Sequence, residues 1–300
     1  MRIGVIGAGL MGTTHARLLS GGVPGAELVA IADPVLPAAD YQDGLELIAS
    51  PDVDGVVIAS PAITHEPFTL ACLEAGKPVL CEKPLAVDAA AALRIVEADT
   101  RGLVTVGFMR RCDPGYVGLK AQMDAIGPPV IVHCAHRNPS VHAFFDSAMI
   151  ITDTVVHEVD ITRWLLGQEI VRVQVLTPRP SSRAREGLRD PQLVIFETEG
   201  GQLVTVEAFV SAGYGYDIQC EVVGEAGTAA LPVAVSQNFQ QRFETAYQHE
   251  LERWVAGEPG ANAWDGYAAA AVCEAAVESL ETGVPVDVSL DRRDATSAAR

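Results

Sequence analysis

Two groups of residues in this chain have the types and the spacing that proton transfer requires. Asp153 and His157 stand four residues apart in a predicted helix, and Lys83 follows a predicted strand within Glu82-Lys83-Pro84. Residues at i and i+4 share one helix face, so the carboxylate can interact with the imidazole and adjust its affinity for a proton near neutral pH. Lys83 would stand at the carboxyl edge of a parallel sheet, where ligands bind. A capping aspartate, a core histidine and a surface lysine are the purely structural alternatives.

The N-terminus carries the pattern of a dinucleotide-binding turn. An apolar strand leads into Gly7-Ala8-Gly9-Leu10-Met11-Gly12, a predicted helix follows, and Asp33 stands 21 residues beyond the last glycine, after a second apolar strand. In this pattern Gly7 makes the tight turn, Gly9 admits a pyrophosphate and Gly12 lets the helix pack closely. The helix N-terminus then faces the phosphates. The alternative is that the glycines only shape a turn and that Asp33 caps a loop.

The residue type at position 33 favours NAD over NADP. The Asp33 carboxylate would accept hydrogen bonds from the adenosine ribose hydroxyls and would repel a 2′-phosphate. The next residues, Pro34-Val35-Leu36-Pro37, provide no arginine to hold such a phosphate. The predicted cofactor-binding residues are Gly7, Gly9, Leu10, Met11, Gly12, Asp33, Glu82 and Lys83.

A third candidate group lies in His133-Cys134-Ala135-His136-Arg137-Asn138. The two histidines resemble a metal-binding pair, but residues three apart on a strand point to opposite faces, so we predict no metal site. His136 and Asn138 share a face and could together hydrogen-bond a polar ligand. The six cysteines form no C-x-x-C pair, which indicates reduced, mostly buried thiols rather than a zinc site or a disulfide framework.

The elements that would position these residues begin with a parallel sheet. Apolar strands alternate with helical stretches from the N-terminus onward, which is typical of a doubly wound α/β fold. The strands are predicted at residues 3–6, 27–32, 55–59, 78–81 and 103–107, and the helices at 13–19, 44–49, 65–75 and 88–100. We therefore predict a Rossmann dinucleotide-binding domain over residues 1–117.

The pattern changes after residue 118 and predicts an α+β second domain over residues 118–300. Helices are expected at 116–125, 152–166, 241–256 and 264–282, and strands at 129–136, 169–177, 192–198, 201–210, 216–224 and 228–231. Short glycine-containing turns separate several of the later strands, which favours an open, mainly antiparallel sheet.

Composition excludes several classes of function. The chain has 300 residues, 49% hydrophobic and 20% charged, which is material for two globular domains. Its formal charge of −18 argues against nucleic-acid binding and disfavours anionic membranes. Because there is neither an 18-residue apolar run nor room for a signal peptide before the first strand, we expect a cytoplasmic protein.

Taken together, the glycine turn, Glu82-Lys83-Pro84 and Asp153-x-x-x-His157 resemble the Gfo/Idh/MocA oxidoreductase family. The resemblance covers essentially the whole chain, and four longer strings resemble the inositol 2-dehydrogenase branch of that family: residues 107–111, 136–139, 214–221 and 263–267. It implies an N-terminal Rossmann domain, a C-terminal α/β domain on an open antiparallel sheet, and a site at the domain interface.

The resemblance also implies an activity, namely NAD-dependent oxidation of a cyclic polyol, with myo-inositol giving 2-keto-myo-inositol. Lys83, Asp153 and His157 match the catalytic residues of the family. His157 would be the base, Asp153 would orient it and stabilise its charged form, and Lys83 would hydrogen-bond the reacting oxygen. The residues that match substrate-contacting positions are Arg110, His136, Asn138 and Tyr216.

Two alternative functions remain open at this point. The same chemistry could act on scyllo-inositol or a pyranose sugar, and a non-catalytic sensor could keep the fold while binding a dinucleotide or sugar. By resemblance we also expect a homo-oligomer, a dimer or tetramer, that buries a broad apolar face of the open sheet. Relative to the family pattern the chain is shorter after Asp33 and before Gln241, which affects the expectations for cofactor preference and for the pocket rim.

Overall fold

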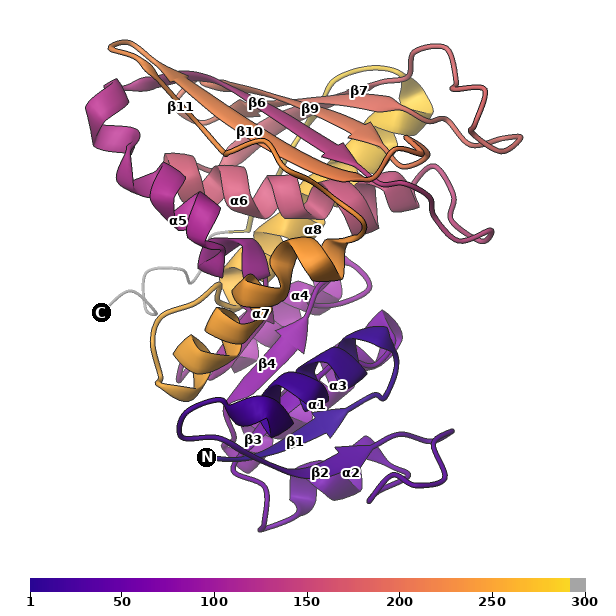
Figure 1. Ribbon diagram of the computed structural model, residues 1–300, viewed down its shortest axis with the longest axis vertical. Coiled ribbons are helices and arrows are strands. Elements are labelled where there is room, and N and C mark those ends of the chain that lie inside the picture. The colour runs from indigo at the N-terminus through magenta and orange to yellow at the C-terminus, as the bar shows by residue number, and fades with distance from the viewer. Residues whose placement is uncertain (292–300) are drawn as a thin grey trace. The chain divides into compact units, whose positions relative to one another are not determined.

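The computed structural model describes residues 1–291, which form two compact units (Figure 1). Unit 1 comprises residues 1–109, 246–270 and Asp291, and unit 2 comprises residues 110–245 and 271–290. The final residues of the predicted second domain, 292–300, lie outside the described residues. None of the helices described within residues 1–291 has the length and hydropathy of a membrane-spanning segment.

Unit 1 is built on a five-stranded parallel sheet. Its strands are β1 (Arg2–Ile6), β2 (Glu27–Ala32), β3 (Gly55–Ile58), β4 (Val79–Glu82) and β5 (Val104–Gly107). They stand in the order β2-β1-β3-β4-β5, and every neighbouring pair is parallel. β3 and β4 are buried along their whole length, because helices cover both faces. The predicted doubly wound sheet is therefore confirmed.

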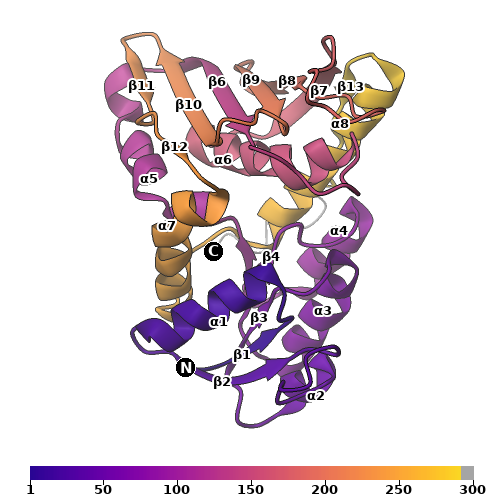
Figure 2. The ribbon, with the colours of Figure 1, turned by 45° about the vertical axis from the view of Figure 1, so that its right-hand side comes forward.

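Helices lie on both sides of this sheet (Figure 2). α1 (Leu10–Gly22) lies on one side, and α2 (Gly44–Ala49), α3 (His65–Ala75) and α4 (Ala89–Ala98) lie on the other. A short 3-10 helix, η1 (Ala62–Thr64), precedes α3. The Asp88 side chain caps α4 by accepting a hydrogen bond from the Ala91 amide at 2.7 Å, so the acid predicted inside this helix instead begins it.

Two long C-terminal helices contribute to both units: α7 (Phe239–Val255) and α8 (Ala263–Thr282). Residues 246–270 belong to unit 1, where the Tyr247 ring meets the His15 ring edge-on at 6.0 Å. The Val106 amide of β5 donates to the Ala261 carbonyl at 2.8 Å. Residues 246–270, from near the end of the chain, thus complete the unit that residues 1–109 begin.

Unit 2 contains an eight-stranded mixed sheet. Its strands are β6 (Pro129–Arg137), β7 (Ile170–Leu176), β8 (Gln192–Thr198), β9 (Leu203–Phe209), β10 (Tyr216–Gly224), β11 (Thr228–Ala230), β12 (Val235–Ser236) and β13 (Val286–Asp287). The main order is β11-β10-β6-β9-β8-β7-β13, with β12 paired to β10. Only β6 and β9 pair in parallel among the described strands of this sheet, so the prediction of a mainly antiparallel sheet is confirmed.

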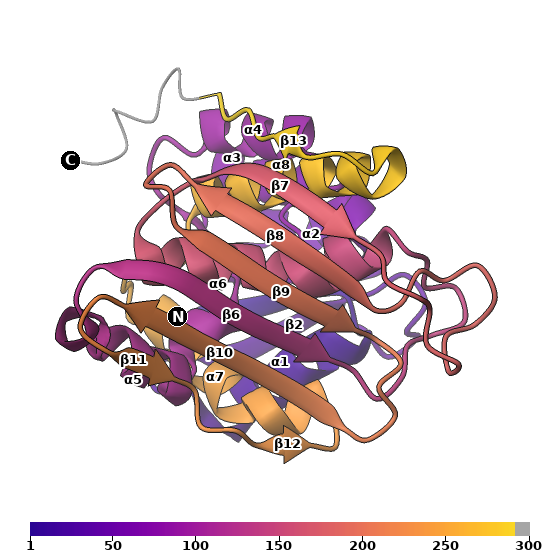
Figure 3. The same cartoon turned by 90° about the horizontal axis from the view of Figure 1, so that it is seen from above.

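One face of this sheet is covered and the other is open (Figure 3). Burial alternates along β8, as expected for a strand with one packed face. The open face carries charged residues as well as apolar ones: Arg137 pairs with Glu207 at 2.7 Å and with Asp217 at 2.8 Å. The expectation of an apolar open face was therefore wrong at the carboxyl end of β6, where cross-strand ion pairs occupy it.

The helices below the sheet include one unexpected geometry. α5 (Pro114–Ala121) is flanked by two 3-10 helices, η2 (Met109–Cys112) and η3 (Met123–Ile126). The helix predicted over residues 152–166 begins instead as a π-helix, η4 (Ile150–Val155), and continues as α6 (Val156–Leu166). The Val156 amide bonds to the Ile151 carbonyl five residues earlier. The i, i+4 argument for Asp153 and His157 therefore assumed the wrong helical geometry, because side-chain periodicity does not reveal a π-turn.

Candidate active site

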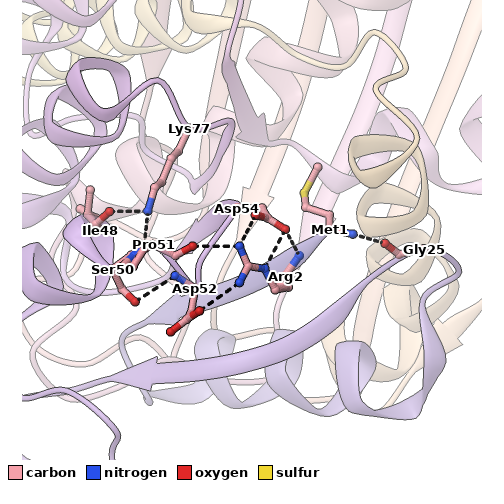
Figure 4. A network of polar contacts seen from close by, with 9 residues as sticks. All are labelled: Met1, Arg2, Gly25, Ile48, Ser50, Pro51, Asp52, Asp54 and Lys77. Atoms are coloured by element: carbon pink, nitrogen blue, oxygen red, sulfur yellow. Dashed lines mark hydrogen bonds and ion pairs between the residues drawn. The ribbon is translucent and has the colours of Figure 1, made fainter.

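The two edges of the unit 1 sheet differ in chemistry. At the amino edge, ion pairs and backbone contacts hold the strands together (Figure 4): Arg2 at the start of β1 bonds Asp54 at 2.9 Å and Asp52 at 3.1 Å. The hydrogen bonds from Arg2 lower the pKa of Asp54 to about 2. The Lys77 amine donates to the carbonyls of Ile48 and Ser50. The predicted functional residues of unit 1 all lie toward the opposite, carboxyl edge.

The glycine turn after β1 has the form expected for a dinucleotide. Gly7 has a φ of +93°, and a Cβ at this position would stand 2.7 Å from the Ala59 carbonyl oxygen. A Cβ on Gly12 would stand only 1.8 Å from the Gly7 oxygen, so the close helix packing requires glycine there. Around the Cβ position of Gly9, by contrast, nothing lies within 4 Å. The turn therefore keeps open space at the one glycine predicted to approach a pyrophosphate.

Asp33 follows β2 and contacts the same turn. One carboxylate oxygen accepts from the Ala8 amide at 2.7 Å, and the other accepts from the amides of Val35 and Leu36 at 2.9 and 3.0 Å. These backbone hydrogen bonds, that of Ala8 above all, lower the pKa of Asp33 although burial opposes them. The loop-capping contacts considered as an alternative are thus present. An ionised carboxylate with about four lone-pair sites can also accept ribose hydroxyls, so the two roles are compatible.

Glu82 and Lys83 stand at the carboxyl end of β4. Glu82 is buried, and its Oε1 lies 2.8 Å from His15 Nε2 while its Oε2 accepts from the Lys83 amide at 3.3 Å. The Lys83 side chain is half-buried, and the following peptide bond to Pro84 is cis. The Glu82 carboxylate therefore fixes the backbone that carries Lys83. Sequence reasoning missed His15, although its position three residues after Gly12, on the helix of the turn, was a usable signal.

His65 is a second buried histidine near Lys83 that the sequence did not indicate. Its Nδ1 lies 2.7 Å from the Pro84 carbonyl oxygen and its Nε2 lies 2.8 Å from the Ser60 carbonyl oxygen. Carbonyl oxygens only accept, so satisfying both contacts requires an imidazolium with two N–H groups. Burial alone lowers the pKa of His65, but the Cys81 thiol and the two carbonyls raise it to about 9. This charged ring ties the loop after β3 to Pro84.

In unit 2, the structure brings three of the predicted substrate-binding residues together. Arg110 Nη2 lies 3.0 Å from His136 Nδ1, and the Tyr216 hydroxyl lies 3.3 Å from His136 Nε2. Arg110 also donates to Tyr116 at 3.5 Å. Burial raises the pKa of Tyr216 to about 12, so its hydroxyl remains protonated near neutral pH. The result is a connected buried polar network on the covered side of the sheet.

This network has a member that sequence reasoning missed. The Glu158 carboxylate accepts a hydrogen bond from Arg110 Nη1, and its other oxygen lies 3.1 Å from His136 Nδ1. The side chains of Arg110 and Glu158 are each only 1% exposed. Burial alone would raise the pKa of Glu158, but its interactions with Arg110 and His136 hold it below its ordinary value. A buried arginine requires such a partner, yet sequence spacing does not identify which acid provides it.

The remaining predicted residues of unit 2 differ in their burial and contacts. His157 is buried, and its ring centroid lies 6.2 Å from that of His136. Asp153 is exposed within η4. Asn138 is half-buried directly after β6, where its backbone N–H donates to the Phe209 carbonyl. His133 is exposed and contacts Thr205 at 2.8 Å. The two histidines of β6 thus face opposite sides of the sheet, as their odd separation predicted.

Comparison with known proteins agrees with these two units. The sequence model described as the oxidoreductase family with an NAD-binding Rossmann fold matches residues 1–108, and the GFO/IDH/MocA C-terminal domain matches residues 120–230. Inositol 2-dehydrogenase 1 of Saccharopolyspora erythraea is 49% identical over 97% of both chains, and inositol 2-dehydrogenase of Rhodococcus erythropolis is 45% identical over 100% of this chain and 98% of its own.

Among solved structures, the chain is similar to myo-inositol dehydrogenase from Lactobacillus casei in complex with NAD(H) and myo-inositol. The TM-score is 0.93 and the sequence identity is 36%, and the match covers 97% of each chain. Similarity of this extent includes both units, each taken with its own fold.

Proposed function

Because this chain belongs to the Gfo/Idh/MocA oxidoreductase family, we propose that it oxidises myo-inositol to 2-keto-myo-inositol (scyllo-inosose) with NAD. The observation that carries the proposal is the full-length similarity to inositol 2-dehydrogenases. One similar structure is that of a myo-inositol dehydrogenase in complex with NAD(H) and myo-inositol. Fold alone would not support a function of this precision. The residue types in both units match the chemistry that this reaction needs.

Unit 1 supplies the groups that would hold NAD, whose nicotinamide ring accepts the hydride when it is bound. The open space at Gly9 admits the pyrophosphate, and the N-terminus of α1 favours its negative charge. Asp33, ionised and held by the Ala8 amide, would accept the ribose hydroxyls and disfavour a 2′-phosphate. The wider set of cofactor-binding residues, which includes Leu10, Met11, Glu82 and Lys83, remains a prediction.

For the chemical step, we assign the proton transfer to His157. The imidazole would take the hydroxyl proton as the hydride leaves the same carbon, Asp153 would stabilise the resulting imidazolium, and Lys83 would stabilise alkoxide character on the oxygen. Glu82 holds the backbone of that lysine. The polyol hydroxyls would be bound by Arg110, His136, Asn138 and Tyr216.

The larger organisation follows the same proposal. Residues 1–117 would bind NAD, and residues 118–300 would bind the polyol and mediate oligomerisation. We propose a cytoplasmic homo-oligomer, a dimer or tetramer, that buries the open sheet face around Arg137 and Glu207. The mixed charge of that face suits a self-complementary contact, because a two-fold interface places each charge near the partner's copy of the same patch.

The proposal is tested by following NADH absorbance with myo-inositol, scyllo-inositol, D-chiro-inositol and glucose, with NADP as the parallel cofactor. We expect turnover of myo-inositol with NAD and little with NADP. Faster turnover of scyllo-inositol or glucose would keep the chemistry but replace the substrate. If folded protein binds NAD and yet oxidises none of the four polyols, the proposal is wrong and a sensor role takes its place.

A further inference from the structure

We propose that Glu158 is a positioning residue for the polyol-binding side chains. It anchors Arg110, and it selects the His136 tautomer whose Nε2 can accept a hydrogen bond from the Tyr216 hydroxyl. This inference rests on the proposed polyol oxidation, and it deepens that function by naming what holds the polyol-binding group in place. Glu158 is itself a buried member of the network, with its side chain 1% exposed.

The contacts show that Glu158 connects two functional side chains. One carboxylate oxygen accepts from Arg110 Nη1, and the other lies 3.1 Å from His136 Nδ1. Arg110 Nη2 in turn lies 3.0 Å from the same His136 nitrogen. Two buried groups, one a donor and one an acceptor, therefore approach the same imidazole nitrogen, and that nitrogen can form a hydrogen bond with only one of them at a time.

The charge on Glu158 decides that arrangement. A neutral imidazole carries one proton: on Nδ1 it can be donated to Glu158, whereas on Nε2 it leaves Nδ1 to accept from Arg110. The ionised, desolvated carboxylate of Glu158 is a stronger hydrogen-bond acceptor than a neutral imidazole nitrogen. The contact therefore favours the tautomer that carries its proton on Nδ1. His136 Nε2 is then an acceptor, and it can receive the hydroxyl proton of Tyr216, which lies 3.3 Å away. A polyol hydroxyl that binds beside Tyr216 would then meet a phenolic oxygen whose proton is directed toward His136.

The same helix provides a matched control. Asp160, two residues after Glu158 on α6, is also 1% exposed and pairs with an arginine, Arg111, at 2.6 Å. Arg111 Nε and Nη2 donate to the two carboxylate oxygens of Asp160 at 3.1 and 2.6 Å. Glu158→Gln and Asp160→Asn therefore each remove one buried carboxylate charge from an arginine pair, and Glu158→Gln removes the charge that lies 3.1 Å from His136 Nδ1.

The test measures three quantities in each variant: KM and kcat for myo-inositol at saturating NAD, the dissociation constant of NAD, and the ¹⁵N chemical shifts of His136 in histidine-labelled protein. For Glu158→Gln we expect KM to rise about tenfold or more, NAD affinity to change less than about twofold, and the ¹⁵N shifts to move from the Nδ1–H to the Nε2–H pattern. Asp160→Asn should leave KM and the His136 shifts unchanged even if its thermal stability falls.

Several outcomes would overturn the inference. Unchanged KM and ¹⁵N shifts in folded Glu158→Gln would do so, and so would an equal rise of KM in Asp160→Asn, since that would reflect general loss of a buried charge. If Glu158→Gln does not fold, Glu158→Asp takes its place, and an unperturbed His136 spectrum there would count against the proposal. If the wild-type protein oxidises no polyol, the proposed function fails, whereas the His136 shifts still report on the role of Glu158.

Discussion

His65 offers a quantitative test of whether a charged imidazole stabilises unit 1. The pKa of this ring is about 9 in the folded protein, against an ordinary value of 6.5, because Cys81 and the carbonyl oxygens that face its two nitrogens at 2.7 and 2.8 Å together outweigh the opposing effect of burial. At about 1.4 kcal/mol per pH unit, the rise corresponds to about 3 kcal/mol of folding free energy. Since the folded-state pKa is raised, this stabilisation is fully present below about pH 6.5 and is lost as the pH rises through about 9.

The experiment compares the free energy of unfolding of the wild type and His65→Gln by urea titration at about pH 6 and about pH 10. Glutamine carries no charge in this range, so the variant lacks the titration of residue 65 while every other group titrates in both proteins. We expect the wild type to be more stable than the variant at the lower pH, and this difference to shrink by about 3 kcal/mol at the higher pH.

The control is His133→Gln, which removes an exposed histidine that contacts Thr205 on the open face of unit 2. Its difference from the wild type should show no comparable change between the two pH values. If the difference for His65→Gln is as large at about pH 10 as at about pH 6, then the ring is not charged in the folded protein and one of its two carbonyl contacts is not a hydrogen bond.

Three further predictions concern the site. Lys83→Ala or His157→Ala should lower kcat about 100-fold or more while the protein stays folded, and turnover at the wild-type rate in both variants would remove their catalytic assignment. Gly12→Ala should lower the free energy of unfolding by about 2 kcal/mol or more, because its Cβ would lie 1.8 Å from a carbonyl oxygen. Gly9→Ala should instead leave thermal stability unchanged and weaken NAD binding about tenfold, measured by titration, and equal losses of stability would contradict this contrast. Asp33→Ser should lower the ratio of activity with NAD to activity with NADP about tenfold or more. An unchanged ratio would show that Asp33 does not select the cofactor.

Much of unit 1 could be predicted from local sequence patterns. The predicted strand at residues 27–32 and the short helix at 44–49 match β2 and α2 to the residue. Both are bounded by strong local signals: Asp43, for example, caps α2 by accepting from the Leu45 amide at 2.9 Å. The glycine turn was equally predictable, because positive φ and close packing restrict Gly7 and Gly12 to the smallest residue.

The features that escaped prediction are contacts between distant parts of the chain and one local departure from α-helical geometry. Glu158 and Arg110 are 48 residues apart, and His65 meets a carbonyl 19 residues away, so no local period indicates either contact. The π-helix that carries Asp153 has the apolar pattern of an ordinary helix, and only its backbone hydrogen bonds distinguish it. The ion pairs of Arg137 on the open sheet face likewise arise from cross-strand neighbours that meet once the register is set.

The order of the chain also has a consequence for how this protein is made. Unit 1 starts at the N-terminus, yet Tyr247, Trp254 and Ala261 complete it: the Trp254 ring is buried, with an atom 3.3 Å from where a Cβ of Gly55 would stand. During synthesis the sheet strands leave the ribosome before these residues are added, so unit 1 cannot reach its complete packing until residues 246–270 have been made. A nascent chain that stalls before residue 246 would therefore lack Tyr247 and Trp254, and the part of unit 1 that Trp254 covers near Gly55 would be exposed.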